Sequence, residues 1–221
     1  MSRTFCAALF DLDGVLFNTE PLHRRAWIET MHGFGEAIDD AFLMPWTGIP
    51  CIELAAHLET SISPHRDRAI YHAAKGDAFR RIVETDLSPF PGALDAVAAV
   101  AERFRCTYVT SNDRIDAEFM LRASGYASII RTGIAYEDVK RHKPDPEPYL
   151  AAACLIDVDP SRCLVVEDSP SGVASAKAAG MTVLAVTTSF AALRLEAADE
   201  VFPDTISACE RLLTMNGRRS T

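Results

Sequence analysis

Short apolar runs alternate with longer amphipathic stretches along most of the chain, and acidic residues follow the first run. Residues 7–10 form the apolar run Ala-Ala-Leu-Phe, which predicts a buried strand. The run ends at Asp11, and Gly14 permits a tight turn shortly afterwards. The carboxylates of Asp11 and Asp13 are therefore expected just beyond the carboxyl end of a strand, where open α/β sheets bind their ligands.

Between residues 17 and 90 the apolar positions follow a helical spacing. One apolar stripe is formed by Leu22, Ala26, Trp27 and Met31. A second helix is predicted near residues 52–58, and a third over residues 66–84 places Lys75 on its apolar stripe. The Pro- and Gly-rich segment 88–92 ends this region. We therefore expect residues 17–90 to form a helical domain inserted after the first strand.

From residue 91 onward the predicted strands and helices alternate. Strands are expected at residues 106–110, 128–132, 163–166, 182–186 and 201–202. Helices are expected at residues 93–104, 114–124, 143–156 and 171–179, and after residue 202. This alternation is typical of a parallel sheet with helices on both faces. The sequence therefore predicts an α/β fold with one helical insertion.

Composition narrows the range of partners. The chain has 221 residues, of which 48% are hydrophobic, enough for a packed core. Its net charge of −9 argues against a nucleic-acid or anionic-membrane partner, because both bind clustered Lys and Arg. A small anionic substrate remains compatible, since it needs only a local positive site. We expect a monomer or a weak dimer.

The cysteines indicate a reducing compartment. All six are scattered without a Cys-x-x-Cys pair, mostly in apolar surroundings, and are expected to be reduced. We see no signal peptide before the first strand and no apolar run of the roughly 18 residues that a membrane span requires. A cytoplasmic location is therefore expected.

Polar residues follow three of the predicted strands. They are Asp11 and Asp13, then Ser111 and Asn112, and finally Glu167 and Asp168. Any one group could be an ordinary helix cap. In a parallel sheet, however, all three groups lie along one edge, and Lys143 opens a neighbouring helix. Together these residues suit the binding of a phosphoryl group.

The acidic residues also predict a divalent cation. Two carboxylates as close as Asp11 and Asp13 repel each other unless a cation or a shared proton intervenes, and oxygen ligands favour Mg²⁺. An EF-hand loop starts similarly but requires an acid or amide where Val15 stands. With Mg²⁺ held by Asp11 and Asp168, Asp11 could attack phosphorus while Asp13 protonates the leaving oxygen.

Four segments resemble the ordered motifs of the haloacid dehalogenase-like hydrolase superfamily. They are Asp-Leu-Asp-Gly-Val-Leu at 11–16, Val-Thr-Ser-Asn at 109–112, His-Lys-Pro-Asp-Pro-Glu-Pro-Tyr-Leu at 142–150 and Val-Val-Glu-Asp-Ser-Pro-Ser-Gly-Val at 165–173. Residues 18–23 and 174–181 resemble the subgroup with a helical cap, which contains sugar and polyol phosphatases and β-phosphoglucomutase. The dehalogenase branch fits poorly, because it lacks the second acid that Asp13 supplies.

The resemblance implies a Rossmann-like core, residues 1–16 and 91–221, and a cap at residues 17–90. It implies a metal site formed by Asp11, Asp13 through its carbonyl, Asp168 and a supporting Glu167. The expected phosphate or substrate contacts are Ser111, Asn112, Lys143, His23 and Lys75. His23 and Lys75 stand at positions that resemble cap groups of β-phosphoglucomutase, although His23 could equally be an ordinary helix residue.

Three functions remain open from the sequence. The first is a Mg²⁺-dependent phosphatase that hydrolyses a small phosphorylated metabolite, a sugar or polyol phosphate, through an aspartyl-phosphate. The second is a β-phosphoglucomutase-like phosphomutase, against which the segment 46–53 argues because it lacks the basic residue that would grip a second phosphate. The third is a receiver-like signalling module, which the order of the acidic motifs and the helical insertion disfavour.

Overall fold

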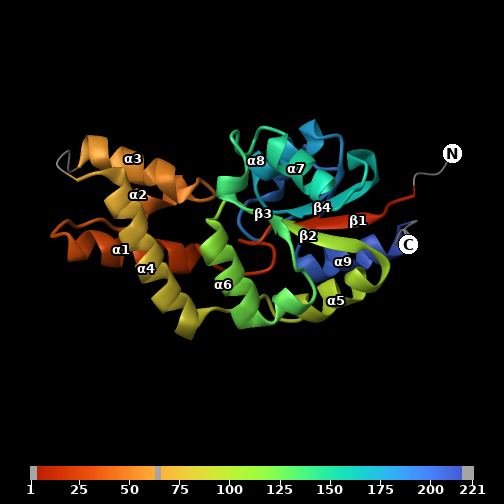
Figure 1. The fold of residues 1–221 in the computed structure, drawn as a ribbon, viewed down its shortest axis with the longest axis horizontal. Coiled ribbons are helices and arrows are strands. Elements are labelled where there is room, and N and C mark those ends of the chain that lie inside the picture. The colour runs from red at the N-terminus through yellow and green to blue at the C-terminus, as the bar shows by residue number, and fades with distance from the viewer. Residues whose placement is uncertain (1–3, 63–65, 216–221) are drawn as a thin grey trace. The chain divides into compact units, whose positions relative to one another are not determined.

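The computed structural model describes residues 4–62 and 66–215 (Figure 1). The chain divides into two compact units. Unit 1 contains the residues up to Phe17 and those from Pro89 onward, and unit 2 is Asn18–Ser88. The chain leaves and re-enters unit 1 at adjacent points, because Phe17 bridges to Pro89 and the Phe90 amide donates to the Leu16 carbonyl at 3.1 Å.

Unit 1 contains a six-stranded parallel sheet with the order β3-β2-β1-β4-β5-β6. The strands are β1 Ala7–Phe10, β2 Arg105–Val109, β3 Gly133–Ile134, β4 Cys163–Glu167, β5 Thr182–Val186 and β6 Glu200–Phe202. Each neighbouring pair is parallel. The predicted α/β fold with a Rossmann-like parallel sheet is therefore confirmed.

Helices cover both faces of this sheet. They are α5 Ala93–Arg103, α6 Arg114–Ser124, α7 Glu147–Leu155, α8 Pro170–Ala178 and α9 Thr205–Thr214. Helices α7 and α8 lie on one face, and α5 and α9 pack together on the other (Figure 1). Parallel strands covered in this way are apolar on both faces, which explains why all four residues of β1 are buried.

Alternate side chains of the central strands enter the core beneath α7 and α8. Leu9 of β1 and Val165 of β4 pack there against Ala152 of α7 and Val173 of α8. This packing fixes the register of the sheet, because a shift by one residue would turn each strand's side chains to the opposite face. It thereby fixes where each strand ends.

One predicted strand is wrong. Residues 128–132 were expected to be extended, but the short 3₁₀ helix Tyr126–Ser128 follows the left-handed Gly125, and the strand is Gly133–Ile134. The amides of Ile129 and Ile130 both donate to the Tyr126 carbonyl, at 2.9 and 2.8 Å. Ile130 is buried through this turn, so its apolar character reflects core packing instead of sheet pairing.

Unit 2 is helical and has its own core. It contains α1 Glu20–Gly33, α2 Asp40–Leu43, a 3₁₀ turn at Met44–Trp46, α3 Cys51–Ser61 and α4 Arg68–Asp86. Helix α4 packs against both α1 and α3. The core is formed by Trp27, Met31, Leu43, Leu54, Ala55, Leu58 and Tyr71. Among the described residues, no helix is both long and apolar enough to cross a membrane.

Candidate functional site

The candidate site begins where β1, β2 and β4 end. Phe10 lies opposite Tyr108 and Val166 in the sheet, so Asp11 follows directly in register with the next residues of both neighbouring strands. The Asp11 amide donates to the Val166 carbonyl at 3.1 Å. The parallel register therefore brings the polar residues after these three strands to one edge, as the sequence predicts.

A buried lysine joins two of the acidic residues. The Lys143 ammonium donates to Asp11 Oδ1 at 3.0 Å, to Glu167 Oε1 at 2.6 Å and to the Val109 carbonyl at 3.1 Å. Its side chain is only 6% exposed, and that of Glu167 is fully buried. All three protons of the ammonium thus have acceptors, which is how a buried lysine keeps its charge.

Glu167 is held by many donors. Its Oε1 accepts from Lys143 and from the Tyr149 hydroxyl at 2.9 Å. Its Oε2 accepts from the Asp168 amide, the Ser169 amide and the Ser169 hydroxyl, each at 3.0 Å. The first turn of α8 approaches so closely that a Cβ on Gly172 would lie 1.7 Å from Glu167 Oε1. Both oxygens of this carboxylate are therefore already bonded within the protein.

Asp168 lies against the turn that follows β1. Gly14 has a φ of +73°, and a Cβ there would meet Asp168 Oδ2 at 1.8 Å and Ser189 Oγ at 2.4 Å. The Ser189 hydroxyl hydrogen bonds with Asp168. Glycine at position 14 thus serves both the backbone conformation and the close approach of the Asp168 carboxylate.

The charges of the site are unbalanced. Burial, joined by the nearby Glu167 and Asp13, raises the pKa of Asp11 to about 8 despite the adjacent Lys143. Burial and the neighbouring Glu167 and Asp11 also raise the pKa of Asp168 well above its usual range. Burial acts against ionisation of Glu167 too, but Lys143 and the hydrogen-bond donors outweigh it and lower its pKa.

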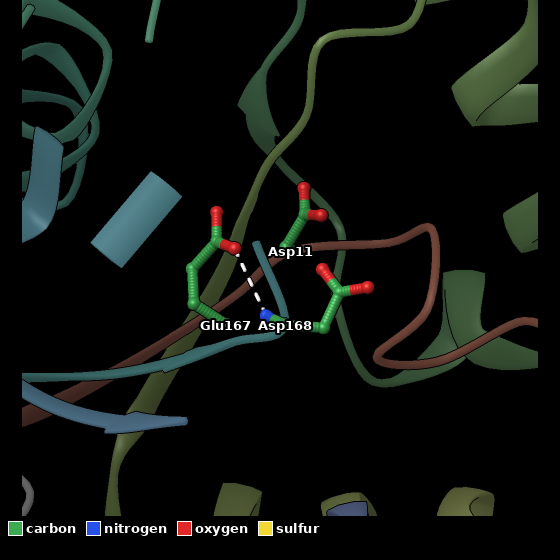
Figure 2. A group of neighbouring side chains, drawn as sticks. All are labelled: Asp11, Glu167 and Asp168. Carbon is green, nitrogen blue, oxygen red and sulfur yellow. Dashed lines mark hydrogen bonds between the residues drawn. The ribbon is translucent and has the colours of Figure 1, made fainter. Parts of the chain in front are cut away.

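This arrangement fits a divalent cation. Asp11, Glu167 and Asp168 are buried, and one oxygen of each lies within 4.8 Å of the others (Figure 2). In Figure 2 one carboxylate oxygen of Glu167 accepts a hydrogen bond from the backbone amide of Asp168, the next residue. One lysine cannot neutralise three carboxylates, and oxygen donors suit a hard ion such as Mg²⁺. The chemistry of the donor set therefore matches the predicted metal.

Asp13 is positioned from the end of β2. Asn112 Nδ2 donates to Asp13 Oδ2 at 2.6 Å, and the Asn112 amide donates to the Thr110 hydroxyl at 3.1 Å. Asp13 is partly exposed, unlike the buried Asp11. Ser111 is also partly exposed, between these two anchored neighbours. Contact of Ser111 or Asn112 with a phosphate stays a prediction.

His23 and Lys75 belong to unit 2, where the structure brings them together. Lys75 Nζ lies 2.7 Å from His23 Nδ1, and Lys75 is 2% exposed. The His23 ring stacks on Phe79 with centroids 4.1 Å apart. The apolar stripe of the third predicted helix thus does contain a buried lysine. Its contact with a substrate stays a prediction.

Sequence reasoning missed two polar residues of the site. Tyr149 was part of a recognised motif but received no role, although a buried tyrosine hydroxyl needs a hydrogen-bond partner and so signals a nearby acceptor. Ser189 carries no comparable signal, because the loop after β5 has no motif and only the tertiary structure brings it to Asp168.

Comparison with known proteins identifies the relatives of this chain. The family model described as haloacid dehalogenase-like hydrolase matches residues 8–186. The validoxylamine A 7'-phosphate phosphatase of Streptomyces hygroscopicus subsp. limoneus is 34% identical over 199 residues, which cover 89% of this chain and 92% of that protein. The fructose-1-phosphate phosphatase YqaB of Escherichia coli K12 is 29% identical, over 84% of this chain and 98% of that protein.

A solved structure agrees with the fold. The crystal structure of CbbY from Rhodobacter sphaeroides in complex with phosphate superimposes with a TM-score of 0.83 at 27% identity, covering 92% of this chain and 96% of that one. The resemblance noted in the sequence motifs is therefore confirmed by the match over residues 8–186 and by the fold.

Proposed function

The chain belongs to the haloacid dehalogenase-like hydrolase family and acts as a phosphoric monoester hydrolase, and we propose that it is a Mg²⁺-dependent phosphatase of small sugar or polyol phosphates. The observation that carries this proposal is the arrangement at the end of β1. There the buried Asp11 contacts Lys143, and Asp13 is held separately by Asn112. Two aspartates in different environments can perform different tasks.

Asp11 is the proposed nucleophile. One of its oxygens attacks phosphorus, the bond from phosphorus to the ester oxygen breaks, and an aspartyl-phosphate forms. Lys143 donates to Asp11 Oδ1 at 3.0 Å, which holds that oxygen in place and leaves the other oxygen for the attack. The hydrogen bonds of Glu167 keep the Lys143 ammonium in position.

Asp13 is the proposed acid and base. It gives its proton to the departing ester oxygen, and later takes a proton from the water that attacks the aspartyl-phosphate. Its partial exposure suits this role, because both the leaving group and the water must reach it. The hydrogen bond from Asn112 fixes its direction. Water attack then releases phosphate and restores Asp11.

The phosphate requires positive charge. Lys143 supplies one positive charge and the Ser111 hydroxyl a donor. Asp11, Asp168 and the Asp13 carbonyl would hold Mg²⁺, which would offset the charge of the phosphate dianion. Glu167 was included among the expected metal ligands. Because both of its oxygens already accept hydrogen bonds, we assign it to holding Lys143 and the first turn of α8.

Unit 2 is the proposed cap that selects the substrate. It is joined to unit 1 by two adjacent chain segments, a connection that permits hinge motion about Phe17 and Pro89. The segment Trp46–Glu53 has no Lys or Arg to grip a second phosphate, which favours hydrolysis over a phosphomutase reaction. The named phosphatases among the relatives support the same choice.

Product analysis tests this proposal. The protein is supplied with a panel of sugar and polyol phosphates in Mg²⁺, and released phosphate is measured against Asp11→Asn as the control. We expect release from several monoesters and none from Asp11→Asn. In a separate reaction, β-glucose 1-phosphate is supplied with catalytic β-glucose 1,6-bisphosphate. Conversion to the 6-phosphate faster than phosphate release would establish the mutase instead.

A further inference from the structure

Unit 2 contains a cluster of ionisable side chains of its own, formed by Cys51, His23 and Lys75. Cys51 is the first residue of α3, His23 lies on α1 and Lys75 on α4, so three helices meet at this point. The Cys51 thiol hydrogen bonds with both His23 and Lys75. Lys75 Nζ also lies 2.7 Å from His23 Nδ1. These contacts all lie inside one compact unit.

The buried ammonium of Lys75 needs a negative partner. Within the described ranges of the chain, Lys75 makes no ion pair with a carboxylate. Its other contact is the face of the Phe79 ring, with Nζ 4.3 Å from the centroid. A buried charge is costly unless it is paired, and a ring face compensates only part of that cost. A thiolate at Cys51, which interacts with Lys75, would supply a counter-charge inside the same cluster.

The local environment favours this thiolate. Burial acts against the charged sulfur, but Lys75 and the hydrogen bonds outweigh it and lower the pKa of Cys51. The start of an eleven-residue helix acts in the same direction, because helix N-termini stabilise anions. In contrast, burial raises the pKa of both Cys163 and Cys209 to about 12. The position of Cys51 thus differs from that of an ordinary core cysteine.

We propose that Cys51 is a covalent modification site whose thiolate, paired with Lys75 and His23, reacts with low-molecular-weight disulfides. The sulfur anion forms a bond to one sulfur of the disulfide, the old sulfur–sulfur bond breaks, and the other half leaves as a thiolate. One disulfide is consumed and one is formed, so no further oxidant takes part. Cys51 is partly exposed as a residue, and the labelling rate measures how readily a reagent reaches its sulfur. The site lies wholly within unit 2, and its test measures labelling of Cys51, not phosphate release.

Competitive labelling of the full-length protein tests the site. Dipyridyl disulfide is added below stoichiometry at neutral pH, and labelled peptides are quantified by mass spectrometry over time. The internal reference is Cys154, which is more exposed but lies outside the cluster. We expect Cys51 to react about tenfold faster than Cys154. Equal or slower labelling of Cys51 would overturn the proposal.

A pair of lysine variants tests the cause of the reactivity. Lys75→Met removes the buried charge and is expected to slow Cys51 labelling about tenfold, whereas the matched Lys177→Met removes an exposed lysine and should leave the rate unchanged. Lys75→Arg retains the charge and should stay within about threefold of the wild type. If Lys75→Met lacks the wild-type circular dichroism, Lys75→Gln replaces it, with the same expected slowing. Rates that do not depend on Lys75 in a folded variant would refute the pairing.

Incubation with oxidised glutathione then shows whether a biological low-molecular-weight disulfide also reacts with Cys51. We expect one mixed disulfide per chain, located on the Cys51 peptide, absent in Cys51→Ser and reversed by a thiol reductant. Modification confined to other cysteines would contradict the proposal, whatever the phosphatase activity of the preparation.

Discussion

Replacing Glu167 with glutamine tests whether this residue holds the buried charges of the site together. Glutamine keeps the size of the side chain but has one oxygen instead of two. Glu167 accepts from Lys143 and Tyr149 at one oxygen and from the Asp168 and Ser169 amides at the other. Whichever way the new amide is turned, its NH₂ group, itself a donor, replaces an oxygen that accepted hydrogen bonds from the donors on that side. A single rotation cannot satisfy both sides.

The structure indicates the size of the effect. Removing one partner of a buried ion pair costs about 3–5 kcal/mol, since the other charge stays buried. Part of this cost is offset here, because Glu167 also repels Asp11 and Asp168 and raises their pKa values. We therefore expect the lower end, about 3 kcal/mol. For a chain of this length that lowers Tm by roughly 6–12 °C.

Glu118→Gln is the matched control. It makes the same chemical change at an exposed ion pair on α6, where Arg122 lies 3.2 Å away. An exposed pair contributes about 0–1 kcal/mol, so Tm should fall by less than roughly 4 °C. Both variants are melted in excess chelator, which removes any stabilisation by a bound metal.

A third variant with a smaller expected loss of stability extends the series. Tyr149→Phe removes one neutral hydrogen bond to Glu167 and should cost about 1 kcal/mol, between the two other variants. A difference in Tm of less than about 2 °C between Glu167→Gln and Glu118→Gln corresponds to at most about 1 kcal/mol. That result would refute the expected effect, because the buried pair would then contribute no more than an exposed one.

Four further predictions concern the proposed chemistry. Asp13→Asn should lower kcat by about 10²–10⁴-fold, and a quenched reaction of this variant should still trap phosphate on the protein. The quenched reaction of Asp11→Asn should trap none. Near-normal turnover of an alkyl phosphate by Asp13→Asn would contradict these roles. Chelation should abolish activity and Mg²⁺ restore it. The raised pKa values of Asp11 and Asp168 leave protons on the metal-free site. Mg²⁺ binding should therefore release protons, and its affinity should increase as the pH rises from about 6 to about 8. Calorimetry in buffers of different ionisation enthalpy measures the proton release, and pH-independent binding would count against the prediction. Gly14→Ala should lose activity without unfolding, as its Cβ would meet Asp168 Oδ2 at 1.8 Å; unchanged kcat/KM would show that Asp168 can move freely.

Features that depend on neighbours in the sequence were predictable. Strand β1 is buried on both faces, so its residues must all be apolar, and this gives a recognisable continuous run. The turn after it requires a positive φ at position 14, which glycine adopts readily. Helix α6, Arg114–Ser124, agrees with its prediction at both ends, because Gly125 in the left-handed conformation closes it. The grouping of Asp11 with Glu167 was also predictable, since parallel strands end at one edge of a sheet.

Features that depend on contacts distant in sequence were not predictable. The apolar residues Ile129 and Ile130 suggested a strand, yet burial alone does not distinguish a strand from a buried turn. Residue identity did not reveal that Asn112 donates to Asp13, because side-chain direction depends on the folded backbone.

The same limit applies to the two lysines. The sequence placed Lys75 on an apolar helical stripe and Lys143 at the start of a helix beside the sheet edge. Their partners, however, lie up to 132 positions away, Asp11 for Lys143 and His23 for Lys75. Sequence periodicity determines which face of a helix is buried, because that depends on spacing alone. Only tertiary packing decides which charge meets which partner, and therefore which lysine belongs to the carboxylate site and which one faces a thiol.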